Sequence, residues 1–161
     1  MSEPKWLQLA RKEVGTKEIP GGRSNPVVSK YYADAVGASK PDSVPWCAAF
    51  VGAMLQRAGV RPSGSLLARS YMNWGKKLST PVPGCIAVFQ RGSGGHVGFY
   101  VSGTGSKITL LGGNQNDMVS IGTRSNAGLI GYRWPSTYRM EMEKESWYRR
   151  TINKIKSFMG C

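Results

Sequence analysis

The first half of the chain repeats its apolar residues at intervals of three or four, the spacing of one face of an α-helix. The clearest case begins at Cys47 and stops before Gly59, with Phe50, Val51 and Met54 on one stripe. A glycine directly after such a run commonly ends a helix. The pattern predicts four helices: residues 4–14, a helix that starts at Pro26, residues 47–58 and residues 67–78.

The second half changes to an alternation of period two, which is typical of β-strands. Glycine-rich turns such as residues 91–95 and 102–105 separate the alternating segments. Helices followed by a meander of about five strands predict an α+β fold and not an alternating βαβ fold. The predicted strands are residues 85–90, 96–102, 107–111, 118–121 and 129–134.

The length of 161 residues suits one compact domain with a core of its own. No apolar run approaches the roughly 20 residues of a transmembrane helix, and the first residues do not read as a secretory signal. We therefore expect synthesis in a cytoplasm. After Pro135 the composition becomes charged, so we expect a domain over residues 1–135 and an extension over residues 136–161.

Charge restricts the partners. Lys and Arg number 22 against nine Asp and Glu, a net charge of +13, which attracts nucleic acid, anionic lipid or envelope polymers. The bases are scattered and match no RNA-binding signature, so we expect no specific nucleic-acid partner. A basic surface that serves only solubility is the alternative.

Three cysteines, Cys47, Cys85 and Cys161, form an odd set that suits no disulfide framework. With His96 as the single histidine and no close cysteine pair, the spacings of a zinc site are absent, and we expect no metal and no cofactor. At least one thiol is therefore free, either as a small apolar side chain or as a nucleophile.

Cys47 and His96 are the candidates for catalysis. Cys47 follows Pro45-Trp46 and opens an apolar helix, where the helix dipole should lower the pKa of the thiol. His96 begins a predicted strand and is the one imidazole base available. A thiol at a helix N-terminus facing an imidazole on a sheet suits thiol acyl transfer, with nearby amides for the oxyanion. A packed cysteine and a structural histidine are the alternative.

A third polar group should orient the imidazole. Asn114 is the first polar residue of the turn after the next strand, and its side chain can accept from the far ring nitrogen. Asp117 in the same turn is the rival. Asn, Asp and Gly are also ordinary hairpin residues, so the segment can be a plain turn.

The motifs around these residues resemble the papain-like peptidoglycan hydrolases of the NlpC-type and CHAP (cysteine, histidine-dependent amidohydrolase/peptidase) families. The resemblance runs in order from about Trp6 to Pro135 and is carried by Pro45-Trp46-Cys47-Ala48-Ala49-Phe50-Val51, Pro83-Gly84-Cys85-Ile86-Ala87-Val88-Phe89, Gly95-His96-Val97-Gly98-Phe99-Tyr100, Gly112-Gly113-Asn114-Gln115 and Gly131-Tyr132-Arg133-Trp134-Pro135. It implies a papain-like fold, in which N-terminal helices pack on an antiparallel sheet of about five strands and the catalytic cysteine opens a helix. It also implies that Cys47 is the nucleophile, His96 the base and Asn114 the orienting residue. One departure is Gly84-Cys85, where these families usually have Gly-Asp; the missing carboxylate is expected to be a structural turn group.

The resemblance implies cleavage of an amide bond in bacterial peptidoglycan by an amidase or endopeptidase. A basic, monomeric wall hydrolase resembles a phage endolysin, held in the host cytoplasm until release to the periplasm or wall. An antibacterial toxin with the same chemistry is an alternative. So are a thiol acyltransferase and a non-catalytic module that binds envelope polymer or nucleic acid.

The extension has its own pattern. From Ser146 to Cys161 there are four bases and no acid, and Tyr148, Ile152, Ile155 and Met159 recur at helical spacing. One apolar and one cationic face are typical of a helix on an anionic membrane surface. A C-terminal helix docked on the catalytic domain is the alternative.

Overall fold

The computed structural model describes residues 3–138 and 141–159, and in residues 141–148 it describes the backbone alone. Three of the predicted helices are confirmed, as α1 (Lys5–Glu13), α2 (Pro26–Val36) and α3 (Cys47–Arg57). The start of α2 is fixed by the side chain of Asn25, which accepts a hydrogen bond from the Val27 amide. Its end is fixed by Gly37, whose left-handed φ of 79° suits glycine.

The fourth predicted helix, residues 67–78, is wrong in its second half. A short 3-10 helix, η1 (Ala68–Asn73), is followed by a strand, β1 (Lys76–Leu78). Gly75 separates them with φ of 63°, and a Cβ there would lie 2.3 Å from the Trp134 carbonyl oxygen. Close approach to the last strand of the sheet therefore ends the helical turn and starts a strand.

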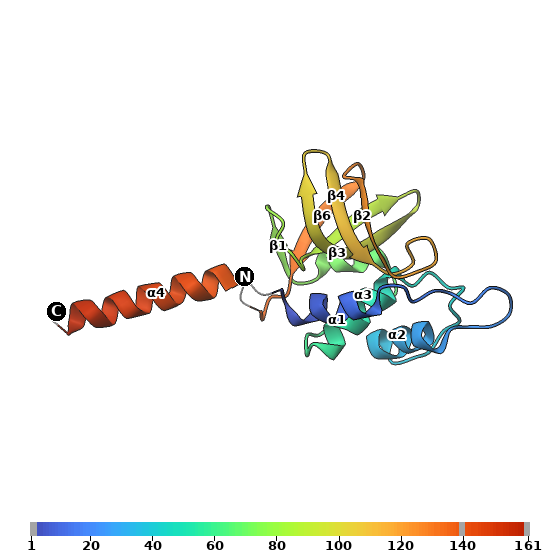
Figure 1. Cartoon of the computed structure of the whole chain (residues 1–161), viewed down its shortest axis with the longest axis horizontal. Coiled ribbons are helices and arrows are strands. Elements are labelled where there is room, and N and C mark those ends of the chain that lie inside the picture. Colours follow the sequence, from blue (N-terminus) through green and yellow to red (C-terminus); the bar gives the residue numbers. More distant parts are fainter. Residues whose placement is uncertain (1–2, 139–140, 160–161) are drawn as a thin grey trace.

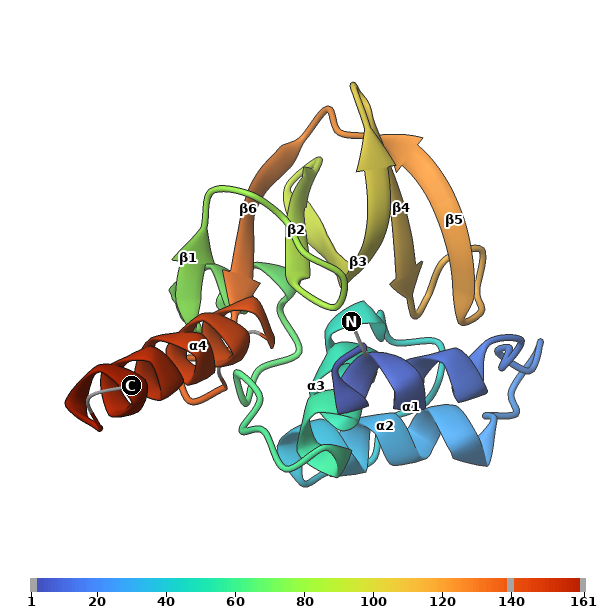
Figure 2. The ribbon, with the colours of Figure 1, turned by 60° about the vertical axis from the view of Figure 1, so that its left-hand side comes forward.

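The sheet has six antiparallel strands in the order β1-β6-β2-β3-β4-β5 (Figure 2). The predicted antiparallel sheet is confirmed, with two differences. β1 is an added edge strand, and β5 lies later in the chain than the predicted residues 118–121. The remaining bounds are β2 (Ile86–Arg91), β3 (Gly94–Thr104), β4 (Lys107–Gly112), β5 (Ser120–Ser125) and β6 (Leu129–Trp134).

The main core lies between the helices and one face of the sheet (Figure 1). Helix α3 is central, because every residue from Cys47 to Leu55 is buried. Alternation along β2 sends Ile86 and Val88 into this core and Ala87 and Phe89 to a smaller apolar cluster on the opposite face.

Aromatic packing closes the N-terminal end of this core. Trp6 is fully buried and donates through Nε1 to the Gly84 carbonyl at 2.8 Å. Its ring packs edge-on against Trp134 and Tyr138 at 5.2 and 4.7 Å between centroids. The folded body therefore reaches at least Tyr138, slightly beyond the expected boundary at residue 135.

The C-terminal segment forms the helix α4 (Glu141–Phe158), which extends away from the sheet and the other helices (Figure 1). None of the helices in the described residues is long and apolar enough to pass through a bilayer. Cys161 lies outside the described residues, as does the side chain of Tyr148.

Candidate active site

Cys47 is the first residue of α3, and its side chain is 7% exposed. Burial raises the pKa of the thiol above its ordinary value, although hydrogen bonds from the backbone amides of Val97, Ala48 and Cys47 itself work in the opposite direction. The expectation that the helix N-terminus gives this thiol a low pKa is therefore wrong: removal from water outweighs the amides. The resting group is a neutral thiol.

His96 lies in β3 and is 3% exposed. Burial lowers the pKa of its imidazole to about 4, with Arg124 and Arg91 adding repulsion and a hydrogen bond to Gln115 opposing the shift. The ring is therefore neutral at neutral pH, as a general base must be.

The two candidate residues approach each other through the backbone of β3. The Val97 amide contacts the Cys47 sulfur, which brings the thiol to the strand position next to His96. Within the described residues no direct hydrogen bond joins the thiol to the imidazole. Catalytic hydrogen bonds are often long in free enzymes and shorten when substrate binds.

The side chain that contacts the imidazole is Gln115. Its Oε1 lies 3.0 Å from His96 Nε2, while its Nε2 donates to the Ser120 carbonyl at 2.9 Å and to the Ser120 hydroxyl at 3.2 Å. A carbonyl oxygen only accepts, so this pairing fixes the orientation of the amide and leaves Oε1 as an acceptor toward the ring. His96 Nε2 therefore carries the hydrogen, and Nδ1 has the free lone pair.

Asn114 and Asp117, the residues expected to orient the imidazole, line the same pocket without bonding to the ring. Their backbones are left-handed, with φ of 55° and 60°. Asn and Asp are the non-glycine residues that tolerate this conformation best. Asn114 thus serves the turn, and the position expected for it beside the imidazole belongs to Gln115. The sequence signal for this turn role is Asn114 directly after two glycines, because Gly and Asn are typical turn residues.

Gly113 lets the loop between β4 and β5, residues 113–119 (the Gln115 loop), pack closely against α3. A Cβ at this position would lie 2.6 Å from the Cβ of Phe50 and 2.8 Å from the Trp46 ring. Trp46 is itself fully buried and donates through Nε1 to Glu18 Oε1 at 2.6 Å. The absence of a side chain at Gly113 therefore lets the loop that orients His96 pack directly on the turn that carries Cys47.

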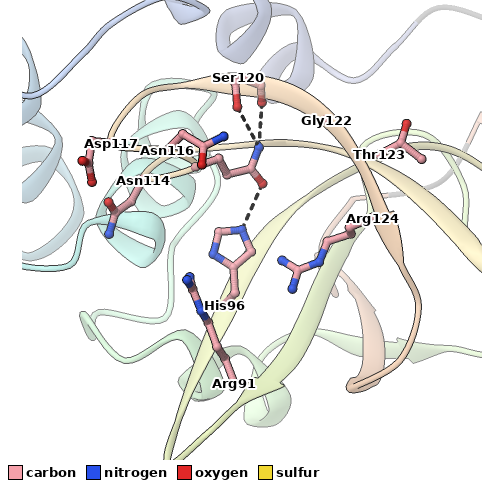
Figure 3. A pocket seen from close by; sticks show the side chains of 10 residues that line it. Arg91, His96, Asn114, Asn116, Asp117, Ser120, Gly122, Thr123 and Arg124 are labelled. Carbon is pink, nitrogen blue, oxygen red and sulfur yellow. Dashed lines mark hydrogen bonds between the residues drawn. The ribbon is translucent and has the colours of Figure 1, made fainter.

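His96 also lines an open pocket of about 740 Å³ (Figure 3). Arg91 and Arg124 stand beside the ring, and Asn114, Asn116 and Asp117 gather at the other end. The pocket is lined by the last residue of β2, by His96 of β3, by the Gln115 loop and by β5. The imidazole, although almost fully buried, thus forms part of the wall of an open pocket.

Cys85 is the second described thiol, and it belongs to the core. It is fully buried, and burial raises its pKa to about 12. In the described part of the chain, no three His, Cys, Asp or Glu side chains gather where they could hold a metal ion. Cys85 therefore lacks both the access and the environment of a nucleophile.

Comparison with known proteins agrees with this geometry. A papain-like arrangement, with the cysteine helix packed on an antiparallel sheet that carries the histidine, defines the class. Residues 39–114 match the family model of the CHAP domain, which confirms the resemblance to this family over that segment. The match ends at Asn114, one residue before Gln115.

Two solved structures are similar in fold. The endolysin LysIME-EF1 superposes with a TM-score of 0.56 at 14% identity, over 84% of this chain and 65% of the endolysin. The peptidoglycan hydrolase RipB from Mycobacterium tuberculosis superposes with a TM-score of 0.54 at 14% identity, over 84% of this chain and 64% of the hydrolase. The chain thus spans slightly less than two thirds of the length of either neighbour. No curated protein matches it by sequence.

Proposed function

We propose that this chain is a cysteine-dependent hydrolase that cleaves an amide bond in bacterial peptidoglycan and acts as a phage endolysin. The observation that carries the proposal is the oriented imidazole of His96, held by Gln115 beside the strand residue whose amide contacts the Cys47 sulfur. The CHAP match and the two neighbours, whose names state a lysin and a peptidoglycan hydrolase, support the substrate.

The first half-reaction follows from the ring orientation. His96 Nδ1 takes the proton of the Cys47 thiol as the sulfur attacks the amide carbonyl, and a C–S bond forms. The charge that develops on the oxygen is stabilised by the amides at the start of α3. The imidazolium then returns its proton to the departing nitrogen, the C–N bond breaks, and a thioester remains on Cys47.

The second half-reaction releases the acid. A water gives a proton to Nδ1 and attacks the thioester carbonyl, and the thiol leaves with that proton. An amine in place of water would give acyl transfer. Gln115 holds the ring throughout, because its Oε1 accepts from Nε2–H in both the neutral and the charged form.

The test is digestion of purified peptidoglycan by the full chain and by Cys47→Ser and Cys85→Ser. Both variants replace a buried sulfur with oxygen, so they are matched for packing. We expect Cys47→Ser to be inactive with nearly unchanged stability, since a hydroxyl there is a poor nucleophile, and Cys85→Ser to keep its activity. An inactive Cys85→Ser with an active Cys47→Ser would reverse the assignment.

Mass spectrometry of the released fragments identifies the bond. A free lactyl carboxylate on the glycan indicates an amidase, and a new peptide terminus indicates an endopeptidase. An added primary amine that appears in the products instead of water indicates a transferase. Retention of full digestion by both Cys47→Ser and His96→Ala would refute cysteine chemistry.

The endolysin role places the protein in the host cytoplasm until it is released to the cell wall. The net charge of +13 would then draw the monomer toward anionic wall and membrane polymers. A toxin of the same chemistry would act on the same bond, so expression during phage lysis, measured against expression during contact with rival cells, separates the two roles.

A further inference from the structure

Two guanidinium groups beside His96 are not used by the proposed mechanism. Arg91 ends β2 and Arg124 lies in β5, and both line the pocket that opens on the imidazole (Figure 3). Among the described residues, neither guanidinium group has an ion-pair or hydrogen-bond partner. The guanidinium of Arg124 lies over the Phe89 ring at 4.4 Å, which holds it in place without neutralising its charge.

Two unneutralised cations at one end of an open pocket form an anion site. Asp117, the one carboxylate that lines the pocket, lies at its other end, away from Arg124 (Figure 3). Alternation along β2 puts Arg91 on the same face of the sheet as Phe89, whose cross-strand partner is His96. The cations therefore stand next to the reacting group.

We propose that Arg91 and Arg124 bind a free carboxylate of the peptide substrate, on the residue next to the amide bond that is cut. This inference rests on the proposed function and adds a substrate class to it, namely an acidic peptide. A carboxylate binds a guanidinium group through paired hydrogen bonds. The net contribution of a hydrogen bond to a charged group corresponds to an increase in affinity of about ten- to hundredfold.

The test measures binding without catalysis, so that it stays separate from the hydrolysis assay. Calorimetry compares an acidic stem peptide with its carboxamide on the Cys47→Ala chain. We expect the acid to bind about tenfold or more tightly, and Arg124→Gln and Arg91→Gln to remove most of that preference. Arg23→Gln is the matched control, because it removes an equal charge from an exposed loop outside the pocket.

Equal binding of acid and amide, or loss of the preference in Arg23→Gln alone, would overturn the carboxylate site. Stronger competition by inorganic phosphate than by acetate would also overturn it, in favour of a wall phosphate. If the acid is preferred but the unaltered chain does not digest peptidoglycan, the proposed function fails while the anion site stands. If peptidoglycan is digested but the acidic peptide and its carboxamide bind equally, the proposed function stands and the anion site fails.

A second observation is independent of the active site. Helix α4 extends away from the body, and its described side chains are largely exposed (Figure 1). Phe158 is 96% exposed and Ile155 is 53% exposed, and at helical spacing both fall on one face. Lys154 and Lys156 flank this face on its two sides and are also exposed.

We infer that this face of α4 lies on an anionic phospholipid surface. Exposed apolar side chains with flanking cations suit the boundary between headgroups and acyl chains, and each base near such a surface favours binding. The commitment to lipid rests on charge: the helix carries four bases and no acid after Ser146.

Vesicle sedimentation tests this assignment on the full chain. We expect binding to phosphatidylglycerol vesicles and about tenfold less to phosphatidylcholine, with a similar loss for Phe158→Ser and for Lys154→Gln with Lys156→Gln. Val27→Ser, which removes an exposed apolar side chain from α2, is the control and should bind normally. Unchanged vesicle binding by the α4 variants would refute the assignment. It would also be refuted if the full chain were a dimer and the Phe158→Ser variant a monomer, since this face of α4 would then bind a second copy of the chain.

Discussion

Acid should destabilise this fold through His96. The ring is 3% exposed, and burial together with Arg124 and Arg91 lowers its pKa from 6.5 to about 4. Between those two values the unfolded chain binds a proton that the folded chain does not, so the free energy of unfolding falls as the pH falls. Each unit of difference in pKa corresponds to about 1.4 kcal/mol, so the full loss in the free energy of unfolding is about 3 kcal/mol. It is absent above about pH 6.5 and complete near pH 4.

Urea unfolding of the wild type and of His96→Gln at intervals from about pH 7 to about pH 4 measures this loss. The variant keeps a polar, neutral side chain, so the difference between the two proteins isolates the imidazole. Carboxyl groups such as Glu3, whose pKa the bond to Arg11 lowers, also lose stability in acid, but they do so equally in both proteins. Curves that fall in parallel over this range would refute the low pKa of His96.

Three further changes test the groups around the imidazole. Gln115→Ala should reduce kcat/KM about tenfold by freeing the ring, whereas Asn114→Gly, which suits the left-handed backbone, should stay within about threefold; the opposite order would restore Asn114 as the orienting residue. Gly113→Ala should reduce hydrolysis and destabilise the fold by about 1–3 kcal/mol in thermal melts, because its Cβ would overlap α3; Gly22→Ala, with open space, is the control, and equal effects would contradict the close approach. Asp42→Ala should reduce stability by about 2 kcal/mol in urea, because the buried carboxylate accepts from the Ile19 and Asn25 amides at 2.9 Å each; an unchanged midpoint would contradict this.

The helices could be predicted because their signals are local. The stripe after Cys47 and the glycine that follows Ala58 lie within one short window, and the structure ends α3 at Arg57. The same reasoning failed for residues 67–78. Leu67, Tyr71, Trp74 and Leu78 fit a helical stripe, but the close contact of Gly75 with Trp134 is a long-range constraint. Pairing of Lys76 with Trp134 then makes β1 a strand.

The strand positions show the same limit. β2 and β6 lie within one residue of their predicted positions. β2 is an apolar run whose alternate side chains enter the two apolar clusters on opposite faces of the sheet, and β6 ends at the buried Trp134. β5 is mostly exposed and has no apolar alternation to mark it, and its register is set by pairing with β4. Its predicted position, residues 118–121, precedes most of the observed strand Ser120–Ser125.

Cys47 and His96 remain the catalytic candidates, and they could be chosen from residue type and local position alone. Their pKa values could not be predicted in this way, because these values depend on burial in the folded protein. A helix N-terminus predicts a thiolate, yet Cys47 is almost fully covered and its pKa is raised. The proposed reaction would therefore start from a neutral thiol and a neutral imidazole, with the proton moving only as the sulfur attacks. A neutral pair of this kind needs a proton acceptor in a fixed position, here Nδ1 of His96. The orientation of the imidazole therefore matters more than it would in a preformed thiolate–imidazolium ion pair.

That orientation depends on one backbone position. Gly113 lets the loop contact Phe50 and Trp46, the residues on either side of the first turn of α3, and Gln115 follows two residues later. The candidate nucleophile and the residue that orients its candidate base thus depend on the same contact between this loop and α3. A shift of the loop away from α3 would move Gln115 away from the imidazole of His96. Substitution of Gly113 should therefore reduce activity before it unfolds the protein.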